Sequence, residues 1–302
     1  MLVRTVDPMG VTEDAAAGLP WDDDGWFNDA AAWIEARVSR SGELELLRTR
    51  PWAALIRVPT AEGLVWFKES APVNGFEPAL TELMAARRPD CVPRVLAAEG
   101  SRMLTADVGP SMRVLLDEKH PAPAWDEVVA LYAGVQIELA GSVDELLALG
   151  VPDSRPETLG HPVAGSLPLT LIHEEVHDGN VHVSEGRPVF IDWAEGSISH
   201  PFAGMTNTLR IVSWVAGWKP GGKEIHLLRD AYLDSWTRFA PIGELREIFA
   251  QAYALGALAR IGTWDRLVAG LTGGLREEYA QNVEAWRGIY AEARQPGAKL
   301  GA

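Results

Sequence analysis

The spacing of hydrophobic residues predicts a first part of the chain in which strands and helices alternate. Apolar residues three and four apart predict an amphipathic helix over 22–42, and a second helix begins at Glu77 with a proline in its first turn. Runs rich in β-branched and aromatic residues predict five strands, at 43–50, 52–59, 63–70, 94–98 and 102–106. A turn over 60–63 joins the second and third of them.

The later part of the chain has mainly the helical pattern. Apolar stripes at three-and-four spacing predict helices at 125–140, 143–149, 224–239, 242–261 and 275–293. Long helices of this kind could form one wall of a cleft for a small molecule. Four side chains are candidates to line such a cleft: Trp236, Tyr253, Trp264 and Asp265.

Between these helices lies a stretch, 167–202, with the pattern of short strands and polar turns. An apolar strand ends at Ile172, a polar turn covers 173–179, and a hairpin then returns the chain to a strand that ends at Asp192. Polar ends of adjoining strands therefore converge, and the side chains of Glu175, Asn180 and Asp192 are expected to share one small volume. Oxygen ligands of this kind suit Mg²⁺, which is a hard cation.

The residues of this stretch resemble a known catalytic loop. The run His173 to Asn180, followed by Ile191-Asp192-Trp193, is similar to the catalytic loop and metal-binding strand of the aminoglycoside phosphotransferase family, whose members are relatives of the protein kinases. In that family a His-x-Asp opens the loop and an Asn follows the Asp by five residues. In this chain Glu175 stands where the family has the catalytic Asp.

The resemblance implies an α+β fold of the two-lobed, protein-kinase-like class, with a small N-terminal lobe containing an antiparallel sheet and a larger, mostly helical C-terminal lobe. Its expected division is a loose N-terminal arm at 1–21, a nucleotide-binding lobe at 22–108, and a catalytic and acceptor-binding lobe at 109–302. It implies transfer of the γ-phosphoryl group of ATP or GTP to a hydroxyl of a small molecule, for which an antibiotic or a sugar-like compound are options. Antibiotic resistance is the physiological role that would accompany an antibiotic acceptor.

In the catalytic loop the resemblance assigns three roles. Asp192 would bind Mg²⁺ and the nucleotide directly, and Asn180 would hold a second Mg²⁺. Glu175 would orient or deprotonate the acceptor hydroxyl. His173 is expected to hold the loop by hydrogen bonds, and the sequence assigns no role to His177 and Asp178.

In the first lobe the resemblance points to a nucleotide site. Lys68 on the third strand would hold the α- and β-phosphates, and a helix carboxylate would position it. Glu77 is the preferred carboxylate, with Glu82 as its rival on the same helix. Ala106, at the end of the fifth strand, would contact adenine at the hinge.

Two other functions remain open. Glu175, in place of the Asp of the family pattern, moves the carboxylate by about 1 to 1.5 Å. Such a displacement is what we would expect in a catalytically silent, kinase-like binding protein. The letters His173 to His177 also match the H-E-x-x-H signature of zinc hydrolases, but that signature needs a helix, and here the run lies between a strand and Asp178-Gly179. A phosphate-loop pattern at 217–223 lacks its Ser or Thr and contains Pro220.

Composition narrows the choice of partners. The net charge is −15 over 302 residues, which argues against nucleic acid and would attract a cationic small molecule. A single cysteine, Cys91, excludes an intramolecular disulfide framework and fits a reducing compartment. No apolar run has the length of a membrane span, so a soluble, cytoplasmic protein is expected. The sequence leaves the oligomeric state undetermined.

Overall fold

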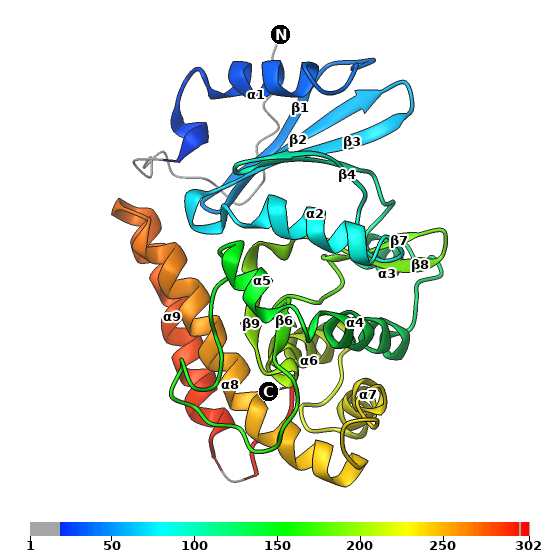
Figure 1. Ribbon diagram of the computed structural model, residues 1–302, viewed down its shortest axis with the longest axis vertical. Coiled ribbons are helices and arrows are strands. Elements are labelled where there is room, and N and C mark those ends of the chain that lie inside the picture. Colours follow the sequence, from blue (N-terminus) through cyan, green and yellow to red (C-terminus); the bar gives the residue numbers. More distant parts are fainter. Residues whose placement is uncertain (1–18, 296, 302) are drawn as a thin grey trace. The chain divides into compact units, whose positions relative to one another are not determined.

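A computed structural model describes residues 19–295 and 297–301 (Figure 1). The chain divides into two compact units. We call them the sheet unit, 1–107 with 265–281, and the helical unit, 108–264 with 282–302. Helices α8 and α9 contribute residues to both units. Most of the predicted N-terminal arm lies outside the described residues, and Pro20 begins a short 3₁₀ helix at its end.

The sheet unit is built on five strands in the order β1-β2-β3-β5-β4, and every neighbouring pair is antiparallel. This sheet and the mainly helical second unit confirm the predicted α+β class. The elements of this unit are η1 (Pro20–Asp22), α1 (Trp26–Glu35), β1 (Glu45–Arg50), β2 (Ala53–Thr60), β3 (Gly63–Ser70), η2 (Pro72–Asn74), α2 (Glu77–Arg87), β4 (Val95–Glu99) and β5 (Arg102–Ala106).

Alternation along β3 sends its side chains to two different helices. Val65 and Phe67 are buried in a core that also contains Trp26 and Ile34 of α1. On the opposite face of the same strand, Lys68 reaches α2. The two helices therefore cover opposite faces of the sheet, as Figure 1 shows.

The first predicted helix was too long. The sequence predicted a helix over 22–42, whereas α1 ends at Glu35. Asp23 accepts a hydrogen bond from the backbone N–H of Gly25, which ends the preceding turn before the helix starts. Beyond the helix, Arg40 forms an isolated bridge with Thr60, so the chain is drawn toward the end of β2 instead of continuing as a helix.

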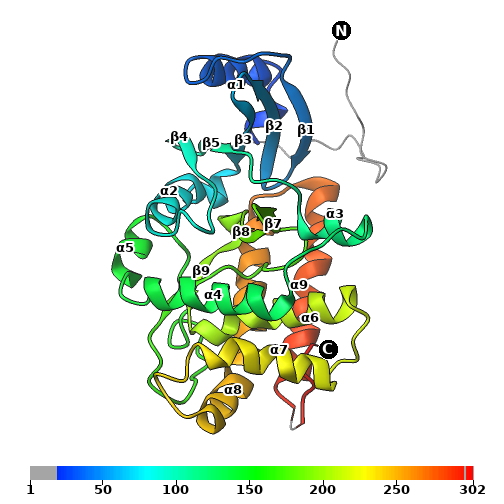
Figure 2. The ribbon, with the colours of Figure 1, turned by 90° about the vertical axis from the view of Figure 1, so that its right-hand side faces the viewer.

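The described part of the helical unit contains four short strands, which form two sheets of two strands each. Strand β6 pairs with β9 and β7 pairs with β8, both antiparallel. Helices α4 and α7 pack against each other, as Figure 2 shows. Its elements are α3 (Met112–Asp117), α4 (Trp125–Leu139), α5 (Val143–Ala148), β6 (Thr170–Ile172), β7 (Val181–Ser184), β8 (Arg187–Phe190), η3 (Trp193–Glu195), β9 (Ser197–Ser199), η4 (Pro201–Gly204), α6 (Met205–Val215), α7 (Lys223–Asp234), α8 (Ile242–Ala269) and α9 (Gly273–Ala293).

Aromatic rings fill the core of this unit. Phe202 contacts the rings of Tyr232, Trp236 and Phe249, with centroids 5.6 to 5.7 Å apart. These rings are buried and join η4 to α7 and α8. Strand β6, which directly precedes residues 173–180, contacts η4 and is thereby joined to this aromatic cluster. No helix in the described part of the chain is long and apolar enough to cross a membrane.

Candidate active site

In the sheet unit, a buried ion pair joins β3 to α2. The Lys68 Nζ lies 2.7 Å from Oε1 of Glu77, and the Glu77 side chain is fully buried. The other carboxylate oxygen of Glu77 accepts a hydrogen bond of 2.6 Å from Ser70 Oγ. Glu82, the rival on the same helix, is exposed. A buried carboxylate at the start of a helix therefore fixes the position of the lysine ammonium.

Ala106 lies at the end of β5, where the hinge was expected. Its backbone N–H donates to the carbonyl of Arg94 at 2.9 Å. The next side chain, Asp107, accepts a hydrogen bond of 2.7 Å from the indole of Trp66. A contact between Ala106 and adenine would therefore use the carbonyl of Ala106 and not its N–H.

In the helical unit, His173 holds the catalytic loop to the strand that precedes Asp192. Its Nε2 lies 2.9 Å from the carbonyl of Ile191, and its Nδ1 accepts from the N–H of Glu175 at 3.3 Å. The ring is fully buried, and this burial lowers the pKa of His173, so the neutral form with hydrogen on Nε2 fits both contacts. His173 therefore connects the loop and the strand without carrying charge.

The three predicted oxygen-bearing residues come from the segments that His173 joins. The side-chain amide of Asn180 donates a hydrogen bond of 3.3 Å to the backbone carbonyl of Glu175. The backbone carbonyl of Asn180 accepts one of 3.0 Å from the backbone N–H of Ile191. Asp192 follows directly, in the left-handed conformation with φ of 64°. This conformation is uncommon for residues other than glycine and often accompanies functional sites.

The Glu175 carboxylate forms an ion pair with Arg260 of α8, a residue that the sequence analysis missed. Burial of this carboxylate raises its pKa, but Arg260 and His177 more than offset that effect, so the pKa of Glu175 lies below its ordinary value. Nearby Asp192 acts in the opposite direction. Glu175 is therefore ionised at neutral pH and is a weak base. An arginine inside an apolar helical stripe was the available sequence signal for Arg260.

The neighbouring loop residues anchor the backbone. Glu174 has φ of 63° and is 3% exposed, and its carboxylate accepts from Ser197 Oγ at 2.6 Å and from Thr263 Oγ1 at 3.0 Å. Asp178, to which the sequence assigned no role, forms two hydrogen bonds of 3.0 Å with the guanidinium of Arg113. Both acidic side chains hold the loop in place through donors from other elements.

The donor set at the end of the loop fits Mg²⁺. The amide oxygen of Asn180 accepts no hydrogen bond from a described residue. Asn180 precedes strand β7 and Asp192 follows strand β8, and these two strands pair with Val181 opposite Phe190. No group of three His, Cys, Asp or Glu side chains arranged to hold a metal occurs among the described residues. Mg²⁺ commonly binds through one or two carboxylates together with substrate phosphates, so a site with few protein ligands suits it.

The zinc signature does not form the structure that it requires. Residues 173–180 form bends and a turn and contain no helix. His173 faces Ile191, whereas His177 accepts a hydrogen bond of 3.0 Å from the N–H of Gly179. The phosphate-loop pattern at 217–223 likewise lies in the connection between α6 and α7.

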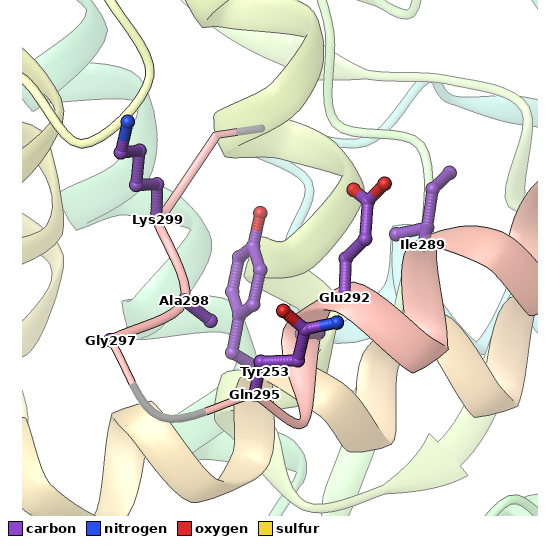
Figure 3. A pocket seen from close by; sticks show the side chains of 8 residues that line it. Tyr253, Ile289, Glu292, Gln295, Gly297, Ala298 and Lys299 are labelled. Carbon is purple, nitrogen blue, oxygen red and sulfur yellow. The ribbon is translucent and has the colours of Figure 1, made fainter.

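Of the side chains proposed to line an acceptor cleft, Trp264 lies beside the partner of Glu175, since its ring centroid is 5.5 Å from the guanidinium of Arg260. Trp236 is fully buried among aromatic rings, and Asp265 belongs to the sheet unit. Tyr253 lines a cavity of about 180 Å³ between α8, the end of α9 and residues 297–299 (Figure 3). The predicted catalytic, metal-binding and nucleotide-binding residues do not line this cavity.

Three solved structures share this fold at low sequence identity. Ethanolamine kinase from Plasmodium vivax gives a TM-score of 0.56 at 10% identity, over 82% of each chain. Macrolide 2′-phosphotransferase type I gives 0.54 at 12% identity, over 89% of this chain and 97% of its own. Amicoumacin kinase gives 0.51 at 10%, over 88% and 93% respectively. These likenesses confirm the kinase-like fold class.

The sequence itself identifies the family. No curated protein matches the chain. The model of the phosphotransferase enzyme family matches residues 97–260, which is more than half of the sequence and includes the whole catalytic loop. This match agrees with the kinase-type phosphotransferase for small molecules that the loop residues predicted. The chain belongs to the phosphotransferase enzyme family.

Proposed function

We propose that the protein transfers the γ-phosphoryl group of ATP or GTP to a hydroxyl group of a small molecule, with Mg²⁺ as cofactor. The observation that carries this proposal is the arrangement around His173, which fastens the Glu175 segment to the strand end before Asp192. Phosphoryl transfer needs an acceptor-orienting carboxylate close to metal-binding oxygens. The two hydrogen bonds of His173 support such an arrangement.

The residues of each unit have separate tasks in this proposal. Lys68, held by Glu77, binds the α- and β-phosphates, and Ala106 contacts adenine through its carbonyl. Asp192 and Asn180 hold Mg²⁺, which when bound neutralises charge on the phosphoryl oxygens. Glu175 accepts a hydrogen bond from the acceptor hydroxyl and orients its oxygen for attack.

The lowered pKa of Glu175 indicates what this carboxylate contributes. A weak base removes a proton late in the reaction, after the bond to phosphorus has begun to form. Its main contribution is therefore the position of the hydroxyl oxygen, which is worth orders of magnitude in rate when it is correct.

A second candidate is a kinase-like binding protein without activity. The ion pair between Glu175 and Arg260 favours this alternative, because a carboxylate that is paired with a guanidinium is less available to a hydroxyl group. The two candidates share the nucleotide site and differ in whether phosphate is transferred.

The deciding experiment measures phosphate transfer from ATP and from GTP, each with Mg²⁺, to a panel of amino alcohols, macrolides, amicoumacin and sugars. The amino alcohols and the antibiotics enter the panel because ethanolamine kinase, macrolide phosphotransferase and amicoumacin kinase share the fold. We expect transfer to at least one acceptor and none from the Asp192→Asn variant. Nucleotide binding without transfer to any acceptor would favour the silent binding protein.

A further inference from the structure

Arg260 is a buried cation to which the proposed reaction assigns no role. It lies on α8, and its side chain is 5% exposed. Its guanidinium lies 5.5 Å from the ring centroid of Trp264 and 5.9 Å from that of Trp286. A guanidinium in such surroundings is costly to bury unless anions compensate it.

Three carboxylates surround this cation. One terminal nitrogen of Arg260 contacts Glu175 and the other contacts Glu195. Glu174 lies further away, with its Oε2 4.0 Å from Nη1 of Arg260. The planar fork of an arginine fixes both of its partners in direction, which a lysine ammonium does not do. Glu195 therefore holds one arm of Arg260 while the other arm reaches Glu175.

The second oxygen of Glu175 faces a different donor. Oε2 lies 3.9 Å from Nε2 of His177. His177 Nδ1 accepts from the N–H of Gly179, so a neutral His177 carries its hydrogen on Nε2 and points it toward Glu175. Arg260 therefore contacts one oxygen of Glu175, whereas His177 lies beyond hydrogen-bond distance of the other.

We infer that Arg260 is a positioning residue, which holds the longer Glu175 side chain in one rotamer and so lets it serve where the family has Asp. A glutamate has one more rotatable bond than an aspartate, and fixing it removes conformations in which the carboxylate misses the hydroxyl. This inference rests on the proposed function, in which Glu175 orients the acceptor.

The first test is a double-mutant cycle in transfer kinetics. Arg260→Gln should lower kcat about a hundredfold, as expected for a carboxylate displaced by about 1 Å. The KM for nucleotide should stay within about twofold. Added to Glu175→Gln, the same substitution should cost nothing further, because Arg260 acts only through that carboxylate. A kcat within about twofold of the native value, or losses that multiply in the double variant, would overturn the inference.

Two variants control for folding. Arg246→Gln removes another arginine of α8, which pairs with Asp230 at the surface, and should leave kcat unchanged. Arg260→Lys keeps the buried charge and loses the fork, so it should fold even where Arg260→Gln does not, and its kcat should still fall about tenfold. Native kcat in a folded Arg260→Lys would also overturn the inference.

Hydrogen exchange separates this inference from the proposed function. In Arg260→Gln the amides of 174–180 should exchange faster than in the native protein and in Arg246→Gln, whether or not an acceptor is known. Unchanged exchange in this segment would show that Arg260 does not hold the loop. Absence of transfer by the native protein, with faster exchange in the variant, would instead reject the proposed reaction and leave the positioning role standing.

Discussion

Asp192 is the proposed metal ligand, and its backbone has the left-handed conformation. Its φ of 64° restricts which residues can replace it. Asparagine tolerates this conformation better than other residues with a β-carbon, and it matches aspartate in volume. Asp192→Asn should therefore keep the native melting temperature and abolish measurable transfer, because only the charge is lost. Transfer at a near-native rate would reject Asp192 as the principal Mg²⁺ ligand.

Glu175 is the residue at which the chain differs from the loop pattern that it resembles. Glu175→Ala should lose at least about a hundredfold in kcat, measured with the acceptor that the native protein prefers. Glu175→Asp should also lose activity, because the shorter side chain cannot reach both Arg260 and the acceptor hydroxyl. A large gain in turnover with Asp would identify the native protein as an attenuated enzyme. An unchanged kcat in both variants would show that Glu175 does not take part in the transfer.

Lys68 and Glu77 allow stability and activity to be separated. Lys68→Met should lower the melting temperature, because loss of one partner of a buried ion pair costs about 3–5 kcal/mol. It should also raise the nucleotide KM or lower kcat by at least about tenfold. Adding Glu77→Gln should restore much of the stability, since the amide can still accept from Ser70. Activity should not return, and a double variant with native kcat/KM would exclude Lys68 from nucleotide binding.

Helix α8 approaches the start of α6 closely at Gly256. A β-carbon at this position would lie 2.1 Å from Thr206 Oγ1 and 2.2 Å from the carbonyl of Ala203. Gly256→Ala should therefore lower the melting temperature, because overpacking costs about 1–3 kcal/mol. Gly243→Ala is the matched control on the same helix, since no atom lies within 4 Å of its added carbon. This control should be neutral or gain up to about 1 kcal/mol in free energy of unfolding. Equal melting temperatures for the two variants would contradict this contact.

Elements whose own residues fix their structure could be predicted from the sequence. Strand β3 has the predicted bounds, because its strong alternation is bounded by the glycine of a turn and by a proline-containing segment. The loop at 173–180 could be singled out because the residues of its pattern are close in sequence. Helix α6 was missed. Its first turn contains Thr206, Asn207 and Thr208, which have low helix propensity. The side chains of Thr206 and Asn207 donate hydrogen bonds to the backbone carbonyls of Tyr253 and Glu174.

Two arginines that contact the loop could not be predicted, because they are far from it in the sequence. Arg260 is 85 positions from Glu175, and no spacing rule connects them. Helix α3, which was also missed, has only six residues and a Ser111 cap, too little for a periodic pattern. Its Arg113 gives Asp178 a partner that the loop sequence alone did not indicate. Local spacing therefore predicted the loop, and only the packed fold reveals what holds it.

The net charge of −15 belongs to the chain as a whole and affects how an acceptor arrives. A cationic acceptor should show a KM that rises several-fold between about 0.02 and 0.3 M salt, because screening shortens the range of the attraction. A neutral acceptor should show a KM that changes little over the same range. Transfer rates at several salt concentrations would test this, and equal salt dependence for both acceptors would contradict long-range attraction.

The cluster around Arg260 also constrains the order in which this corner can change during evolution. Loss of Glu195 first leaves Arg260 paired with Glu175, so the buried cation keeps a carboxylate partner. Loss of Arg260 first leaves three buried or half-buried carboxylates facing one another without their cation. A lineage that leaves this arrangement should therefore replace Glu195 before Arg260.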